Sequence, residues 1–355
     1  MTLLTLPKTA LPDWIQLLQR EFTVVGPKKL KQEYIFDTIR SASELELTYP
    51  TTILPPKKVL LPTREELIQF DFEDNKRNIT PIFDDSPTVL FGVHTCDLHA
   101  IALLDHALNV EYPDQHYLAR RKATTIVSIE CLQPCTEYAF CKSMGTLSVH
   151  ENYDLHLTDL GVRYIIEIGS EKGAELIKSF PSVREGSGED YQQLRRIMSE
   201  KWSKFQYQLD FDISELPSLL SISYHSPVWE ELEARCLACG SCNIVCPTCY
   251  CFNVIDEMDL RLLSGTRVRV WDSCQLDRFA TVAGGHNFRP DRGSRLRHRF
   301  LHKGKYQTES SGMVGCVGCG RCAQTCLVHI SPVEIFNELY RQQRAKQLVE
   351  PEVVS

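Results

Sequence analysis

CLACGSCNIVC, at residues 236–246, contains four cysteines separated by two, two and three residues. CVGCGRCAQTC, at residues 316–326, repeats the same spacing. Cysteines spaced in this way are typical of loops that hold [4Fe-4S] clusters, in which three thiolates wrap one cluster and the fourth binds a neighbouring cluster. Together the two runs supply the eight thiolates that two such clusters need. The sequence therefore predicts a pair of [4Fe-4S] clusters in the last third of the chain.

The fourth cysteine of each run is expected to reach the cluster that the other run surrounds. The two predicted ligand sets are Cys236, Cys239, Cys242 and Cys326, and Cys316, Cys319, Cys322 and Cys246. A glycine follows the second cysteine of each run, at Gly240 and Gly320, where we expect the backbone to approach a cluster closely. Pro247 follows the first run but Leu327 follows the second, a difference that should change the local turn and not the number of ligands.

Zinc binding is the alternative use of these eight cysteines. Zinc sites generally combine two separated Cys-x2-4-Cys pairs, which does not match two repeated runs of four. Disulfides explain the cysteines less well, because the chain has an odd number of them, 15 in all, and would be unusual as a secreted protein. Iron-sulfur ligation is therefore the favoured interpretation.

Composition and charge indicate a globular protein and exclude some classes of function. The 355 residues suffice for two or three domains, and contents of 43% hydrophobic and 24% charged residues are ordinary for a soluble protein. A formal net charge of -7 argues against nucleic-acid binding, which normally requires a basic surface. Pro7 and Pro12 interrupt the N-terminal segment, and no stretch approaches the roughly 18 apolar residues of a membrane span. We expect a cytoplasmic protein that does not insert into a membrane.

The residues before the cysteine runs predict a mixed α/β domain. Strands are indicated by short apolar runs at residues 88–93, 125–129 and 164–170. Helices are expected over residues 14–22, ended by Gly26-Pro27, then after Asp97, which would cap the helix, and from residue 171. Neither a GxGxxG nor a GxxxxGK[ST] loop accompanies the strands, so the sequence shows no dinucleotide-binding or phosphate-binding motif.

The character of the sequence changes at about residue 228, where cysteines become dense and short helical patterns lie between them. We place a domain boundary near Pro227. The predicted fold is an α/β N-terminal domain at residues 1–227, followed by a mainly α-helical, dicluster ferredoxin-like domain at residues 228–355. The long insertion between the two runs, residues 247–315, is expected to contact the N-terminal domain or a partner.

Four further cysteines follow two of the predicted strands. Cys96 comes after the first strand, and the second strand leads into a loop that contains Cys131, Cys135 and Cys141. Strands joined by one helical crossover are commonly neighbours, and the carboxyl ends of parallel strands share one edge of a sheet. These four cysteines could therefore form a third metal site, with either a [4Fe-4S] cluster or zinc. The alternative is that they are small buried side chains that pack the core.

A basic segment, RPDRGSRLRHRFLHKGK at residues 289–305, lies between the two cysteine runs. It is either a solvated, ion-paired connector or a surface that docks an acidic partner. Its positive charge could also tune the potentials of the neighbouring clusters.

Three cysteines near the first run, Cys249, Cys251 and Cys274, belong to no predicted ligand set. We expect them to pack near a cluster or to form hydrogen bonds beside it. The chain shows no Ser/His/Asp order, HExxH motif or paired-carboxylate pattern, so no catalytic residue is assigned.

Several short motifs occur together in an order that resembles one known family. They are FGVHTCDLHAIALLD at residues 91–105, CLQPC with CKSMGT at 131–146, TDLGVRYIIEIGSEKG at 158–173, CPTCYCFNV at 246–254, WDSC at 271–274 and CVGCGRC at 316–322. The combination resembles the family that contains the beta subunit of cytoplasmic [NiFe] sulfhydrogenases and the corresponding iron-sulfur subunit of anaerobic sulfite reductase. The resemblance extends over most of the chain.

This resemblance implies an electron-transfer subunit of a cytoplasmic oxidoreductase complex. Such a subunit would relay electrons through its [4Fe-4S] clusters between a flavin-containing, NAD(P)H-linked subunit and a catalytic subunit of the hydrogenase or sulfite reductase type. The alternative function is that of a redox enzyme acting directly on a small sulfur compound at the N-terminal metal site. Hydrogenase and sulfite reductase both stay open as the terminal enzyme.

Overall fold

The computed structural model describes residues 3–72, 77–178 and 180–349, which belong to two compact units. The first unit contains Met1–Cys135, Leu147–Lys204 and Phe252–Trp271. The second unit contains Thr136–Thr146, Phe205–Cys251 and Asp272–Ser355. The boundary expected near residue 227 stays a prediction. A single division at residue 227 does not coincide with the two units, because residues 205–227 belong to the second unit and residues 252–271 belong to the first.

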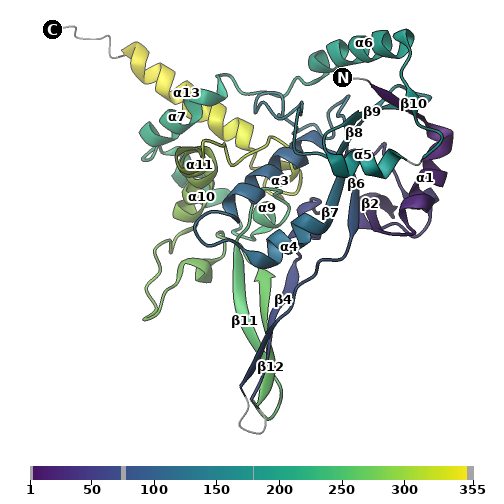
Figure 1. Cartoon of the computed structure of the whole chain (residues 1–355). Coiled ribbons are helices and arrows are strands. Elements are labelled where there is room, and N and C mark those ends of the chain that lie inside the picture. Colours follow the sequence, from purple (N-terminus) through teal and green to yellow (C-terminus); the bar gives the residue numbers. More distant parts are fainter. Residues whose placement is uncertain (1–2, 73–76, 179, 350–355) are drawn as a thin grey trace. The chain divides into compact units, whose positions relative to one another are not determined.

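The first unit is built on an eight-stranded sheet with the strand order β10-β1-β9-β8-β7-β6-β2-β3 (Figure 1). Its strands are β1 (Leu4–Pro7), β2 (Thr23–Leu30), β3 (Glu33–Thr38), β6 (Thr88–His94), β7 (Thr124–Ile129), β8 (Leu155–Asp159), β9 (Arg163–Ile168) and β10 (Arg184–Glu185). β2, β6, β7 and β8 are parallel to one another, and the remaining pairings are antiparallel. A mixed sheet with a parallel centre confirms the α/β class expected for the N-terminal region.

Helices of the first unit accompany this sheet. They are α1 (Leu11–Leu18), α2 (Lys57–Leu60), α3 (Thr95–Ala107), α4 (Gln115–Ala123), α5 (Glu171–Lys178) and α6 (Gly188–Lys204), with short 3-10 helices η1 (Lys8–Ala10) and η2 (Ala42–Glu44). The strand β7 is buried along its whole length, as expected for a parallel strand covered on both faces. Trp14 of α1 packs against Phe91 of β6 with ring centroids 5.3 Å apart, and its Nε1 donates to the Leu176 carbonyl oxygen at 3.2 Å. The core of the unit therefore joins α1 and α5 to the central strands.

The three expected strands are confirmed as β6, β7 and β9, but two details around them are wrong. Gly26-Pro27 does not end a helix, because both residues lie inside β2. The proline is tolerated there because the pairing of β2 with β6 covers only residues 23–25. Asp97 does not cap α3, which begins at Thr95. Asp97 lies instead in the first helical turn, where a negative charge favours the positive end of the helix dipole.

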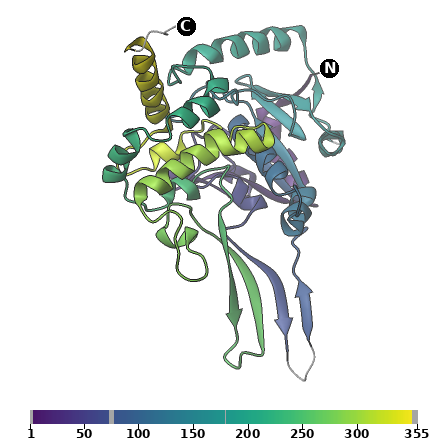
Figure 2. The ribbon, with the colours of Figure 1, turned by 90° about the vertical axis from the view of Figure 1, so that its left-hand side faces the viewer.

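A second sheet of the first unit is antiparallel and has the strand order β11-β12-β4-β5. Its strands are β4 (Arg64–Asp71), β5 (Asn78–Pro81), β11 (Phe252–Met258) and β12 (Ser264–Trp271). Figures 1 and 2 show β11 and β12 as long ribbons beside β4. β11 and β12 come from the insertion between the cysteine runs, so its expected contact with the N-terminal region is confirmed.

Buried ion pairs hold this second sheet to α4. Glu65 of β4 accepts a hydrogen bond from Arg120 Nη2 at 2.7 Å and another from Arg269 Nε of β12 at 3.1 Å. Arg269 also pairs with Asp114, the residue that caps α4. Because each buried charge has an opposite charge in contact, the network offsets the cost of burying it.

The second unit is helical and carries both cysteine runs. Its helices are η4 (Ile213–Glu215), α7 (Leu216–Ile222), α8 (Val228–Arg235), α9 (Ser241–Ile244), η5 (Asp277–Ala280), α10 (Arg292–Leu301), the π-helical η6 (His302–Tyr306), α11 (Gln307–Ser311), α12 (Arg321–Gln324) and α13 (Pro332–Val349). Its core includes Trp229 of α8, Phe300 of α10 and Phe336 of α13, and the last two rings meet edge to face at 5.5 Å. This unit confirms the mainly α-helical class expected for the cysteine-rich part of the chain.

Candidate metal centre

The two cysteine runs fold in the same way. A glycine precedes a one-turn helix in each run, Gly240 before α9 and Gly320 before α12. Their φ angles, +78° and +77°, are left-handed conformations that favour glycine. A Cβ atom on Gly320 would also lie 2.7 Å from the carbonyl carbon of Tyr138. The close approach at this position is therefore to protein backbone, which the spacing of cysteines could not have indicated.

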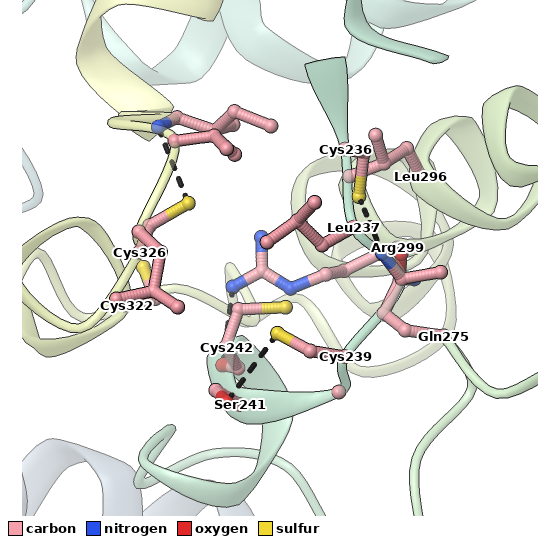
Figure 3. A pocket seen from close by; sticks show the side chains of 15 residues that line it. Cys236, Leu237, Cys239, Ser241, Cys242, Gln275, Leu296, Arg299, Cys322 and Cys326 are labelled. Carbon is pink, nitrogen blue, oxygen red and sulfur yellow. Dashed lines mark hydrogen bonds between the residues drawn. The ribbon is translucent and has the colours of Figure 1, made fainter. Parts of the chain in front are cut away.

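One complete set of four expected ligands, all in the second unit, lines one cavity, which we call the first cysteine pocket (Figure 3). They are Cys236, Cys239, Cys242 and Cys326. Three of them come from the first run and the last comes from the second run. The structure thus brings together the first set of residues expected from the spacing. Cys322 and the apolar side chain of Leu296 complete part of the wall.

A second cysteine pocket in the same unit is lined by the other expected set. These residues are Cys246, Cys316, Cys319 and Cys322. Because Cys322 lines both pockets, the two cavities adjoin. Each cavity is lined by one complete expected set of four thiols, in which the fourth is exchanged between the runs, and the two sets fit the donors of two [4Fe-4S] clusters. Ligation by the individual cysteines stays a prediction.

Three of these thiols are costly to ionise because they are buried. Burial raises the pKa of Cys242 and of Cys316 to about 12, and it also raises the pKa of Cys236. Cys239 is exposed, and a hydrogen bond with the Ser241 hydroxyl, Sγ to Oγ 3.4 Å, lowers its pKa. Since iron is bound by thiolates, cluster binding would release the protons of the buried thiols.

Two buried cations lie against the pockets. Arg299 of α10 lines both pockets, and its Nε donates to Asn243 Oδ1 at 3.2 Å. Lys303 of η6 lines the second pocket, and its Nζ donates to Thr248 Oγ1 at 2.6 Å and to the Gly315 carbonyl oxygen at 3.0 Å. Burial by itself lowers the pKa of each cation, but the negative charge of nearby cysteine thiolates outweighs it and raises both pKa values. Both side chains therefore stay positively charged.

These cations belong to the basic segment at residues 289–305, much of which is not solvated. Arg295, Arg299 and Lys303 are each 5% exposed. Arg297 is only half-buried, and its guanidinium lies over the Tyr224 ring, 4.3 Å from the ring centroid. The interpretation as a solvated connector is wrong for the three buried side chains. The positions of Arg299 and Lys303 against the pockets favour the interpretation that the positive charge of this segment tunes the cluster potentials.

The four N-terminal cysteines are placed in part as expected. β6 and β7 are parallel neighbours, so Cys96 and Cys131, which follow them, lie at the same edge of the sheet. Thr95 Oγ1 is 3.6 Å from Cys131 Sγ, which agrees with this placement. Cys135 also belongs to the first unit, whereas Cys141 belongs to the second. Within residues 3–72, 77–178 and 180–349, no three His, Cys, Asp or Glu side chains are grouped as a single metal ion would require. The third site stays a prediction.

Sequence reasoning missed the arrangement around Cys274. Its buried sulfur is hydrogen-bonded to Cys251 and accepts a hydrogen bond from Asn243 Nδ2 at 2.9 Å. The hydrogen bond with Cys251 is the main cause that lowers the pKa of Cys274 to about 5, and the same bond raises the pKa of Cys251. The three residues come from separate segments, so no motif spacing signals their contact.

Two similarities relate this centre to known proteins. A family model described as a 4Fe-4S dicluster domain matches residues 235–330, which include both cysteine runs. Sulfhydrogenase 2 subunit beta of Pyrococcus furiosus is 36% identical over 332 residues, covering 92% of this chain and 95% of that protein. The chain belongs to the sulfhydrogenase beta-subunit family. No solved structure gives a significant match.

Membership of the sulfhydrogenase beta-subunit family agrees with the resemblance seen in the short motifs. The dicluster domain implies two [4Fe-4S] clusters, and it supports a role in electron transfer within a hydrogenase-related subunit. In the part of the chain that the structure describes, no helix has the length and apolar character needed to cross a membrane.

Proposed function

We propose that this chain is the electron-transfer subunit of a cytoplasmic oxidoreductase complex. It relays electrons through [4Fe-4S] clusters between a flavin-containing, NAD(P)H-linked subunit and a catalytic subunit of the hydrogenase or sulfite reductase type. The observation that carries the proposal is the pair of adjoining pockets, each lined by one complete set of four expected cysteine ligands. The similarity to a sulfhydrogenase subunit supports assembly with redox partners. The chain has 15 cysteines, an odd number that metal ligation explains better than disulfides, which supports a reducing compartment.

The proposed ligands are the two cysteine sets that line the pockets. Cys236, Cys239, Cys242 and Cys326 would hold one cluster, and Cys316, Cys319, Cys322 and Cys246 the other. The clusters would supply one-electron transfer. Because the pockets share Cys322, the proposal places the two redox groups side by side, as a relay requires.

The rim of the first cysteine pocket suits the approach of a partner. Cys239 is exposed, and the neighbouring apolar side chains of Leu237 and Leu327 are 54% and 79% exposed. Both leucines line the pocket. Exposed apolar side chains beside a redox site are a common feature of surfaces that bind another protein. We propose that electrons enter or leave at this rim.

The alternative function places chemistry on a small sulfur compound at the N-terminal cysteines. Its support is the shared sheet edge of Cys96 and Cys131, with Thr95 in contact with the Cys131 sulfur. It requires four cysteines to act together, and they are divided between the two units. The relay needs only residues of one unit, so we favour it.

Anaerobic purification of the tagged full-length chain from its own cells tests the relay. We expect a flavin-containing subunit and a catalytic redox subunit to copurify, and the clusters to be reduced by NAD(P)H in the complex. Addition of the separated flavin subunit should restore reduction to the isolated chain. Recovery of the chain without partners, or turnover of sulfite or polysulfide by the chain alone, would contradict the relay.

A further inference from the structure

Cys251 and Cys274 lie close together in the second unit but outside both ligand sets. The amide nitrogen of Asp272 donates to the carbonyl oxygen of Cys251 at 3.0 Å, which fixes these two chain segments side by side. Two residues further along, the thiol of Cys274 is hydrogen-bonded to the thiol of Cys251. The backbone therefore places the two thiols close enough to interact.

The surroundings of Cys274 stabilise a thiolate. Its sulfur accepts hydrogen bonds from Asn243 Nδ2 at 2.9 Å and from Gln275 Nε2 at 3.7 Å. The carbonyl oxygen of the same Asn243 side chain accepts from Arg299 Nε at 3.2 Å, so the amide extends the influence of that positive charge toward the sulfur. Asn243 and Gln275 are 2% and 1% exposed. A thiolate beside a second thiol is the reactive partner in sulfur redox chemistry, so packing alone does not explain this arrangement.

The thiol pair also lies next to the first cysteine pocket. Asn243 directly follows Cys242, one of the proposed ligands, and its amide contacts Cys274. Gln275, which contacts Cys274, and Arg299, which contacts Asn243, line the pocket itself (Figure 3). Side chains that contact Cys274 or its partner Asn243 therefore also line the place proposed for a cluster.

We propose that Cys251 and Cys274 form a reversible dithiol–disulfide couple that exchanges two electrons with the clusters, an inference that rests on the proposed function. On oxidation, the S–H bond of Cys251 breaks, a bond forms between its sulfur and that of Cys274, and one proton leaves. One electron passes to each of two oxidised clusters, which balances the step. Reduction by two reduced clusters reverses it. The potentials of dithiol–disulfide couples fall within the range that iron-sulfur clusters cover.

Such a couple would give the relay a place to keep an electron pair. A hydride donor such as NAD(P)H delivers electrons in pairs, whereas each cluster carries one at a time. The disulfide would accept the pair from the clusters and return it when the catalytic subunit needs it.

Anaerobic reductive titration of the cluster-loaded, fully oxidised full-length chain tests the couple. The wild type should take up two more electron equivalents per chain than Cys251→Ser or Cys274→Ser. Cys249→Ser removes a neighbouring buried thiol and is the matched control, so it should match the wild type. Alkylation in acid followed by peptide mass spectrometry should find a Cys251–Cys274 cross-link in the oxidised wild type and lose it on reduction.

Equal electron uptake by the wild type and both serine variants, or no cross-link in the oxidised wild type, would overturn the couple. Loss of iron from either variant would also overturn it, because the thiol would then be a cluster ligand. If the variants do not fold, the wild type alone still tests the couple, because the cross-link must be present in the oxidised protein and absent after reduction. Iron-loaded protein without the cross-link contradicts this inference alone, whereas protein that binds no iron contradicts the proposed function and, with it, electron exchange with clusters.

Discussion

Cys239 offers the most direct test of the ligand assignment at the level of single residues. It is exposed at the first cysteine pocket, so its replacement should disturb the core little. We expect Cys239→Ser to lower the iron content from about eight to about four atoms per chain if the two clusters alone are loaded, since only one loses a ligand. Iron and sulfide analysis after anaerobic reconstitution gives the measurement.

Ser241→Ala is the matched control for Cys239→Ser. It removes the 3.4 Å hydrogen bond with the Cys239 sulfur but leaves the thiol in place. The iron content of this variant should equal that of the wild type. Undiminished iron in Cys239→Ser, or loss of both clusters, would contradict the assignment to the first pocket.

Arg299 should raise the potentials of both clusters, because it is buried and lines both pockets. A positive charge favours the reduced, more negative state of a cluster, so Arg299→Gln should lower both potentials. A unit charge about 8 Å away contributes roughly 2 kcal/mol at an effective dielectric constant of about 20, or roughly 90 mV for one electron. Redox titration followed by electron paramagnetic resonance measures the shift.

Two further variants separate charge from packing at this position. Arg299→Lys keeps the positive charge and should keep potentials near those of the wild type. Arg297→Gln removes a half-buried charge that lies over the Tyr224 ring, and it should have a smaller effect. Equal potentials in the wild type and in Arg299→Gln would show that this arginine only supports the fold.

At the level of elements, the loop after β7 decides whether a third metal site exists. If Cys96, Cys131, Cys135 and Cys141 hold a third [4Fe-4S] cluster, the reconstituted full-length chain should bind about twelve irons, at four per cluster. Cys135→Ser should then lower the value to about eight. Gln133→Ala, an exposed position in the same loop, is the control and should leave the iron content unchanged. A folded wild type with about eight irons and no zinc would show that these cysteines pack the protein.

The exposed rim of the first pocket makes a prediction about the whole molecule in its complex. Replacement of Leu327, which is 79% exposed, by Glu should weaken binding to a redox partner, because a charged group would lose its water in the interface. Leu260→Glu is the matched control, since Leu260 is fully exposed in the turn between β11 and β12. The fraction of partner that copurifies should fall several-fold in the first variant only, at constant iron content. Equal losses in both variants would assign no special role to the rim.

The chain as a whole should also depend on a partner for reaction with NAD(P)H. The sequence contains no glycine-rich loop of the kind that binds a dinucleotide or a phosphate group. We expect the purified single chain to release no flavin on acid treatment and to leave NAD(P)H unoxidised. Its clusters should still be reduced by dithionite, which controls for intact redox groups. Flavin in a one-to-one ratio with the chain would overturn this expectation.

The sequence by itself determined the features that depend on short stretches of chain. Cys236, Cys239 and Cys242 lie within seven residues, so their spacing alone indicates a loop that can wrap one cluster. The strand β7 could likewise be predicted, because a parallel strand buried on both faces is a continuous apolar run. The cap of α3 and the end of α1 were predicted wrongly. Gly26 and Pro27 usually mark a turn, but here they pair with β3, so strand pairing outweighs the local residue preference.

The tertiary structure decided what depends on residues far apart in the chain. β12 pairs with β4 although nearly 200 residues separate them. A local sequence pattern can predict a strand, but it does not predict which other strand it pairs with. The basic segment looked like a charged surface, but packing of α10 and η6 buries Arg299 and Lys303 against the cysteine pockets. The contact of Cys251 with Cys274 likewise arises only when their two segments meet. Burial, and with it the charge state of a side chain, is a property of the assembled fold, whereas ligand spacing is already present in the unfolded chain.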